Sequence, residues 1–161
     1  MAVTRIRFPK KDSALFIPEV RAEVAAYFDR TGKSTKADFG MKLKTVLLLG
    51  TTFGAYGLIM TGWFTPLAML GLAILMGIGM AGIGFAVAHD ALHGAYSANP
   101  RVNRALGFSF DLLGANGYMW KITHNVIHHT YTNIPHVDED LTVSPLLRLS
   151  PEEKRDWFHR W

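Results

Sequence analysis

Two apolar runs without a charged side chain, residues 45–63 and 67–88, constrain the fold of this chain most. Each has roughly the 20 residues with which a helix crosses a ~30 Å hydrocarbon core. Backbone groups in lipid must be hydrogen-bonded within their own segment, so such runs form helices. Lys42 and Lys44 precede the first run and Trp63 ends it, as is typical of residues at membrane interfaces. The sequence predicts an all-α, polytopic integral membrane protein built on a transmembrane helical hairpin.

Glycine is frequent in the second run, at positions 71, 77, 79, 82 and 84. Small residues let two membrane helices approach closely, although a glycine-rich run can also be plain lipid-facing sequence. Because glycine weakens a helix, we favour close packing against another helix.

Basic residues set the expected orientation. Ten Lys or Arg precede the first run, seven follow the second, and the connection between the runs has none. The positive-inside rule then places both ends of the hairpin in the cytoplasm. The net charge of +4 comes without a basic patch interleaved with aromatic residues, so nucleic acid is not an expected partner. The absence of cysteine excludes disulfides and thiolate ligands.

Residues 1–42 are soluble in character and are predicted to form a cytoplasmic lead-in. No apolar segment follows the basic N-terminus, unlike in a secretory signal peptide. Pro18 is placed as a first helical residue and Gly32 as a C-cap. Apolar residues at 20, 24, 27 and 28 have helical spacing. They predict an amphipathic helix that lies on the membrane or on the rest of the protein, or a solvated helix with an ordinary packing face.

Histidines follow the second run in two groups. His89 and His93 are four residues apart, and so are His124 and His128, which His129 follows directly. Residues i and i+4 lie on the same face of a helix, so each pair can reach one point. Converging neutral imidazoles suit iron, copper or zinc rather than magnesium or calcium. His136 and His159 lack this spacing and are interpreted as interfacial or hydrogen-bonded residues.

The second histidine group, HNVIHH, is predicted to lie on a short helix. On an α-helix His129 is rotated by about 100° from His128, so it reaches the same centre only through a second metal or at a helix end. Polar neighbours are candidates to orient the imidazole rings or, alternatively, to cap turns: Asp90, Tyr131, Thr132, Asn133, Asp138 and Asp140.

The segments around the second group are predicted to stay on the cytoplasmic side, within a cytoplasmic or interfacial region 89–161. Residues 97–104 are polar, with a turn expected at Asn99-Pro100. Residues 105–120 are apolar but contain Asp111, which favours an interfacial or buried segment over a third span. Ser150, Pro151 and Glu153 have the pattern of a capping box that starts a further helix.

The two histidine groups, HDALH and HNVIHHTYTNIPHVDEDL, resemble the first two histidine boxes of the membrane fatty acid desaturases. The chain is most similar to the acyl-CoA and acyl-lipid branch that includes front-end and linoleoyl-CoA-type enzymes. The resemblance implies that His89, His93, His124, His128 and His129 help to hold two non-haem irons. It implies O2 as co-substrate and a cis double bond in a fatty acyl chain, carried as acyl-CoA or as a membrane lipid. Trp120 would line the acyl tunnel or anchor the interface.

The resemblance also sets expectations about what lies outside these residues. Family members carry a third box, H/Q-x-x-H-H, which is absent here, so we expect an N-terminal portion that is inactive alone and binds iron weakly. No histidine precedes the first run to supply a cytochrome b5 domain, so electrons would come from an external donor such as ferredoxin or cytochrome b5. The alternatives are a related di-iron hydroxylase or monooxygenase acting on lipid, carotenoid or alkane, and a haem-binding electron-transfer subunit. The haem alternative needs histidines within the spans.

Overall fold

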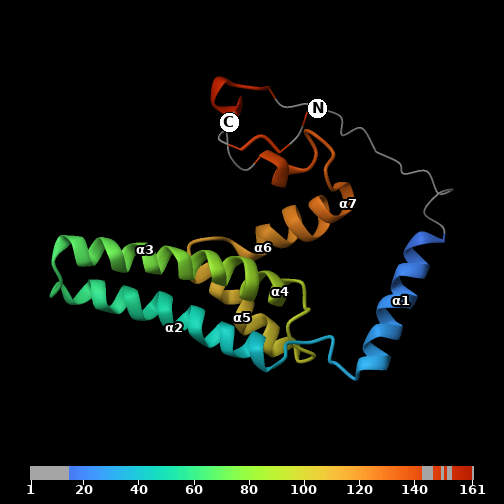
Figure 1. Ribbon diagram of the computed structural model, residues 1–161, viewed down its shortest axis with the longest axis horizontal. Coiled ribbons are helices and arrows are strands. Elements are labelled where there is room, and N and C mark those ends of the chain that lie inside the picture. The colour runs from blue at the N-terminus through green and yellow to red at the C-terminus, as the bar shows by residue number, and fades with distance from the viewer. Residues whose placement is uncertain (1–14, 143–146, 150, 152–153, 161) are drawn as a thin grey trace. The chain divides into compact units, whose positions relative to one another are not determined.

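The computed structural model describes residues 15–142, 147–149, 151 and 154–160. In these residues the regular elements are helices, and no strand is present (Figure 1). The chain divides into two compact units, residues 1–35 and 36–161.

The described part of the first unit is helix α1 (Phe16–Thr31). Gly32 ends it in the left-handed conformation, with φ 62° and its N–H bonded to Phe28 O, as predicted. The predicted start at Pro18 is wrong by two residues, because the helix begins at Phe16. Proline is tolerated at the third position, since N–H groups of the first turn have no helical partner. The side chains of Val20 and Val24, on the apolar face of this helix, are exposed.

The second unit is built on the predicted helical hairpin. Helix α2 (Phe39–Thr61) and helix α3 (Pro66–Ile83) run side by side in opposite directions (Figure 1). Asp38 caps α2 by accepting a hydrogen bond from Met41 N, and Thr65 caps α3. Helix α2 begins six residues before the predicted boundary because Asp38 supplies this cap, so Lys42 and Lys44 lie inside the helix. It ends before Trp63, at the left-handed Gly62.

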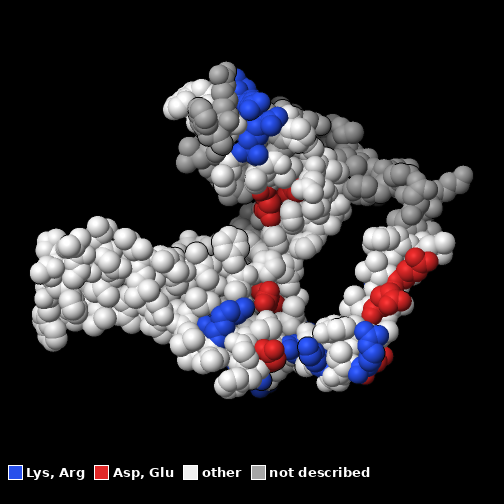
Figure 2. Space-filling view, in the orientation of Figure 1, with Lys and Arg blue, Asp and Glu red and all other residues white. Residues whose placement is uncertain are grey.

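Helix α3 does not end at the predicted residue 88. It continues through a π-helical turn, η1 (Gly84–Ala88), into α4 (His89–Leu92). The two helices of the hairpin, Phe39–Thr61 and Pro66–Leu92, are long and apolar enough to cross a membrane. Large apolar side chains such as Leu67 and Phe85 are 79% and 83% exposed, and the visible face of the hairpin carries no charge along most of its length (Figure 2). Such a surface is suited to lipid rather than water.

Two of the five glycines in α3 and η1 explain how closely the hairpin packs. A side chain at Gly79 would meet Thr52 Oγ1 and lie 3.3 Å from Thr52 N, and one at Gly82 would meet Leu48. Gly71 and Gly77 have nothing within 4 Å. The predicted close packing is therefore confirmed for Gly79 and Gly82 only.

Gly79→Val is expected to destabilise the hairpin by about 1–3 kcal/mol, the usual cost of forcing extra methyl groups into a packed contact. Gly77→Val is the matched control, because it adds the same side chain to the same helix in open space. The midpoint of thermal unfolding in detergent, followed by tryptophan fluorescence, measures the difference. Equal midpoints for the two variants would contradict the expected contact with α2.

The chain after α4 turns back toward the start of α2. Tyr96 is buried, its hydroxyl lies 2.7 Å from Thr45 Oγ1, and its carbonyl accepts from Ala37 N. A turn was expected at Asn99-Pro100, but these two residues are the N-cap and the first residue of a helix. Asn99 accepts from Arg101 N and caps α5 (Pro100–Leu112).

The predicted single segment 105–120 is two helices. Gly114, with φ 86°, separates α5 from α6 (Gly117–Trp120). The carboxylate of Asp111 joins the two helices, because its Oδ1 accepts a hydrogen bond from Gly117 N at 3.2 Å. In the described residues, the helices long and apolar enough to span a membrane are the two of the hairpin.

The remaining elements carry and follow the second histidine group. They are the π-helical η2 (Lys121–His128), α7 (His129–Tyr131) and the 3-10 turns η3 (Glu139–Thr142) and η4 (Trp157–Arg160). Ser150 and Glu153 of the predicted capping box lie outside the described residues. Residues 154–156 are not helical, so the described part does not show the helix expected there.

Candidate metal centre

All five histidines predicted as ligands come together at the end of the hairpin. His89 opens α4 and His93 follows its last residue, while His124 and His128 lie on η2 and His129 opens α7. The ring centroids of His89 and His93 are 4.6 Å apart, and those of His93 and His124 are 5.3 Å apart. His129 lies 4.9 Å from His93. The two sequence groups therefore form one cluster rather than two separate sites.

The second group is wound as a π-helix, which removes the geometric difficulty predicted for His129. A π turn bonds i to i+5 and so turns the chain less per residue than an α turn. The rings of His128 and His129 consequently lie at almost equal centroid distances from His124, 4.9 and 5.0 Å. The predicted short helix is present, but it is wound as a π-helix and not as an α-helix, and the wider turn brings His129 into the cluster.

Two sets of side chains have metal-ligand spacing, with donor atoms within 4.8 Å of one another. The first set is His89, His93 and His124, and the second is His124, His128 and Asp140. His124 belongs to both. Three imidazoles in one set, and two with a carboxylate in the other, suit a transition metal such as iron.

Two buried ring nitrogens support metal binding. The Nε2 atoms of His93 and His124 are buried and have no hydrogen-bond partner among the described residues. A buried polar atom without a partner costs free energy, and a metal ion would supply the missing interaction. The residues present therefore fit a metal in this cluster.

Asp138 is the carboxylate that orients His128. It is 1% exposed and accepts from His128 Nδ1 at 2.9 Å, leaving the other ring nitrogen free. Its oxygens also accept from Asn133 N at 2.8 Å and Asp140 N at 3.1 Å. Burial raises the pKa of Asp138, but the bonds from His128 and the two backbone N–H groups together leave this pKa below its ordinary value. Asp138 is thus held as an anion that accepts a hydrogen bond from the His128 ring, an arrangement common behind histidines that bind metals.

The other polar residues predicted to orient the rings differ in their roles. Asp140 Oδ2 lies 2.6 Å from His124 Nδ1, and Asp90 Oδ1 lies 3.1 Å from His89 Nδ1. Asn133 donates a hydrogen bond to Asp138 through its backbone N–H, and its side chain is exposed. Its backbone has a left-handed φ of 62°. Asp90 and Asp140 therefore have the predicted geometry, whereas Asn133 contributes main chain instead of side chain.

Trp120 packs directly on the cluster. Its ring stacks on His124 with centroids 4.2 Å apart, and it meets the edges of His89 and His93 at 5.4 and 5.3 Å. The ring centroid of Phe110 on α5 lies 5.8 Å from that of Trp120. Trp120 therefore packs flat on His124 within the cluster. Its place beside an acyl chain stays a prediction.

One contact across the site was not predicted. Asn125 Nδ2 donates to Leu92 O at 3.2 Å and so ties the second histidine group to the helix that carries the first. The only sequence signal is an amide placed directly after a ligand histidine. His136 and His159, which were left out of the predicted ligands, belong to neither set with metal-ligand spacing.

The apoprotein, prepared with a chelator, is expected to lose stability as the pH falls from 6.5 towards 4. Burial, and then the neighbouring His89, His129 and His124, lower the pKa of His93 from 6.5 to about 4. In this pH window His93 binds a proton in the unfolded chain but not in the folded protein, so acid favours unfolding. His93→Gln is expected to flatten the dependence of the melting temperature on pH between 6.5 and 4. An unchanged slope in that variant would contradict the lowered pKa.

The sequence was compared with known protein families and with individual proteins. Residues 64–161 match the fatty acid desaturase family. The chain is 34% identical to the sn-1 linoleoyl-lipid 6-desaturase of Synechocystis sp. over 100% of its own length and 44% of that protein. It is 35% identical to the protein of the same name from Arthrospira platensis, over 91% of this chain and 40% of the other. The acyl-lipid (8-3)-desaturase of Physcomitrium patens is 31% identical over 88% of this chain and 30% of its own. No solved structure matches.

These relatives and the histidine cluster agree with the resemblance read from the two boxes. The chain spans less than half the length of the relatives that it matches. The matched family covers both histidine groups, Asp138 and Asp140. This chain belongs to the fatty acid desaturase family.

Proposed function

We propose that the complete protein introduces a cis double bond into the fatty acyl chain of a membrane lipid. Two non-haem irons would be held by His89, His93, His124, His128 and His129, together with ligands from outside these residues. The irons would supply reduction of dioxygen to water and removal of hydrogen from two neighbouring carbons. An unactivated methylene needs such a cofactor, because no side-chain acid or base removes its hydrogen.

The observation that carries this proposal is the single cluster of five imidazoles with two unpartnered, buried Nε2 atoms. The relatives named after acyl-lipid desaturation support a lipid-borne acyl chain as substrate. In this proposal the chain's own residues have separate tasks. Asp138 and Asp140 hold the rings of His128 and His124, and Trp120 shields the cluster on one side.

We further propose that the cluster lies at the cytoplasmic surface of the membrane. His89 and His93 stand at the end of the apolar hairpin helix, and basic residues flank both ends of the hairpin. The positive-inside rule supports a cytoplasmic location for these ends. An external donor such as ferredoxin or cytochrome b5 would then deliver electrons from that side.

Fatty acid profiling tests the proposed function. The complete protein is expressed from its whole reading frame in a host fed a range of acyl chains, with His89→Ala as the inactive comparison. A new cis-unsaturated fatty acid, absent with the variant, is expected. Hydroxylated products in place of unsaturated ones would move the protein to the hydroxylases and monooxygenases of similar chemistry.

A further inference from the structure

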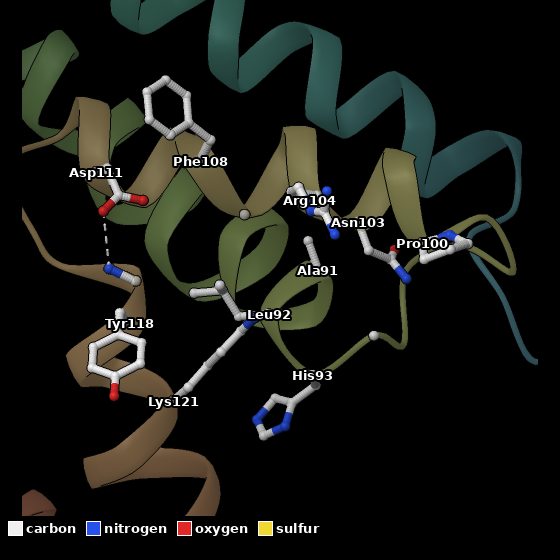
Figure 3. A pocket seen from close by; sticks show the side chains of 13 residues that line it. Ala91, Leu92, His93, Pro100, Asn103, Arg104, Phe108, Asp111, Tyr118 and Lys121 are labelled. Carbon is white, nitrogen blue, oxygen red and sulfur yellow. Dashed lines mark hydrogen bonds between the residues drawn. The ribbon is translucent and has the colours of Figure 1, made fainter.

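A cavity of about 530 Å³ opens next to the metal centre, between the end of α4, helix α5 and the start of η2 (Figure 3). This volume lies within the range of small-ligand sites, about 300–1,000 Å³. His93 lines the cavity and is also a member of the histidine cluster. A molecule bound here would therefore lie beside the metal centre.

Two basic side chains give the cavity its character. Arg104 comes from α5 and Lys121 from the first residue of η2, and Figure 3 shows both directed toward the α4 turn. Among the described residues neither forms an ion pair or a side-chain hydrogen bond. Two unpaired cations that share a concave surface favour an anionic ligand.

The other polar groups of the cavity leave this positive charge largely uncompensated. Asp111 is the acidic residue of the lining, and its Oδ1 accepts from Gly117 N. It stands seven residues after Arg104 on α5, about 10 Å along the helix at 1.5 Å per residue. The amide of Asn103 is used by Ser97 N and Ser97 O, both at 2.8 Å. Arg104 and Lys121 are thus the groups that remain for a ligand.

We propose that this cavity binds the phosphate ester of the acyl substrate. Arg104 offers a planar fork that matches phosphate oxygens, and Lys121 offers a point charge. The phosphate could belong to a phospholipid headgroup or to a soluble acyl carrier such as coenzyme A, because both present the same ester to the two cations. The inference rests on the proposed function, in which the acyl chain extends from this headgroup past His93 toward the metal centre.

Binding measurements on the complete protein, in nanodiscs of uncharged lipid, test the site. The probes are lysophosphatidic acid, coenzyme A and an uncharged monoacyl galactolipid, with the dissociation constant measured by thermophoresis. Arg104→Gln and Lys121→Gln are each expected to weaken phosphate binding about tenfold, as for loss of a charge-assisted hydrogen bond. Arg101→Gln removes an exposed charge from the same helix outside the cavity, and it is expected to leave binding unchanged.

The outcomes separate this inference from the proposed function. Tight binding of lysophosphatidic acid alone supports a phospholipid headgroup, and binding of coenzyme A supports a soluble acyl carrier. Equal affinity for the galactolipid, or no effect of either variant, overturns the phosphate site while cis-unsaturated products still support the desaturase. If no acyl donor is desaturated but both variants weaken phosphate binding, the site stands and the proposed reaction fails.

Discussion

Iron and desaturase activity are both expected to be lost in His124→Ala. His124 is shared by the two sets with metal-ligand spacing, and its buried Nε2 has no protein partner. Its removal therefore takes one ligand from each set, whereas removal of His89 or His128 takes a ligand from one. We expect the iron content of the complete protein to fall at least tenfold, because the loss of a residue that only orients a ligand already weakens metal binding 10–100-fold.

Iron content by mass spectrometry of the purified protein is the measurement, and circular dichroism reports whether the helices persist. The alanine also removes the stacking of Trp120 and the bond to Asp140. His124→Gln, which keeps a polar side chain of similar length, separates metal ligation from packing and should lose iron as well. His136→Asn is the control, since this exposed histidine belongs to neither set and asparagine tolerates its left-handed φ of 63°. Full iron content in both His124 variants would exclude the shared ligand.

The hairpin and the histidine cluster were predictable because each leaves a direct pattern in the sequence. Uncharged runs long enough to cross a bilayer give membrane helices, and i, i+4 histidines give pairs on one face. The ends of the elements were harder. Helix α2 begins among charged residues because Asp38 caps it, and a capping aspartate in a polar stretch is not distinguished from a loop residue by periodicity.

The π turns η1 and η2 could not be predicted in the same way. They change which residues share a face, but spacing alone does not reveal an i to i+5 hydrogen bond. The loop that brings Asp138 to His128 is equally hidden, because it depends on left-handed φ values of 62° and 63° at Asn133 and His136. Such values are uncommon in residues other than glycine. Local sequence therefore placed Asp138 near the cluster without assigning it to one histidine.

Asp138→Asn is expected to weaken iron binding by about 10–100-fold, the usual effect of losing the carboxylate behind a metal-bound histidine. Both oxygens of Asp138 accept hydrogen bonds, from His128 Nδ1 and from the backbone of Asn133 and Asp140. Asparagine replaces one acceptor by an NH2 group, which then faces an N–H donor in a buried place. The apoprotein should also lose about 1–3 kcal/mol of stability, the cost of a buried polar group left unsatisfied.

Asp140→Asn is the informative comparison, because the Asp140 side chain is 38% exposed whereas that of Asp138 is fully buried. If Asp140 only orients His124, water can replace much of its role, and its variant should lose less iron affinity and less stability than Asp138→Asn. If Asp140 instead binds metal with His124 and His128, its variant should lose iron affinity with little change in the melting temperature of the apoprotein. Competition with a chelator measures the first quantity and thermal unfolding the second. Unchanged values of both for Asp138→Asn would show that the bond to His128 does not position the ring.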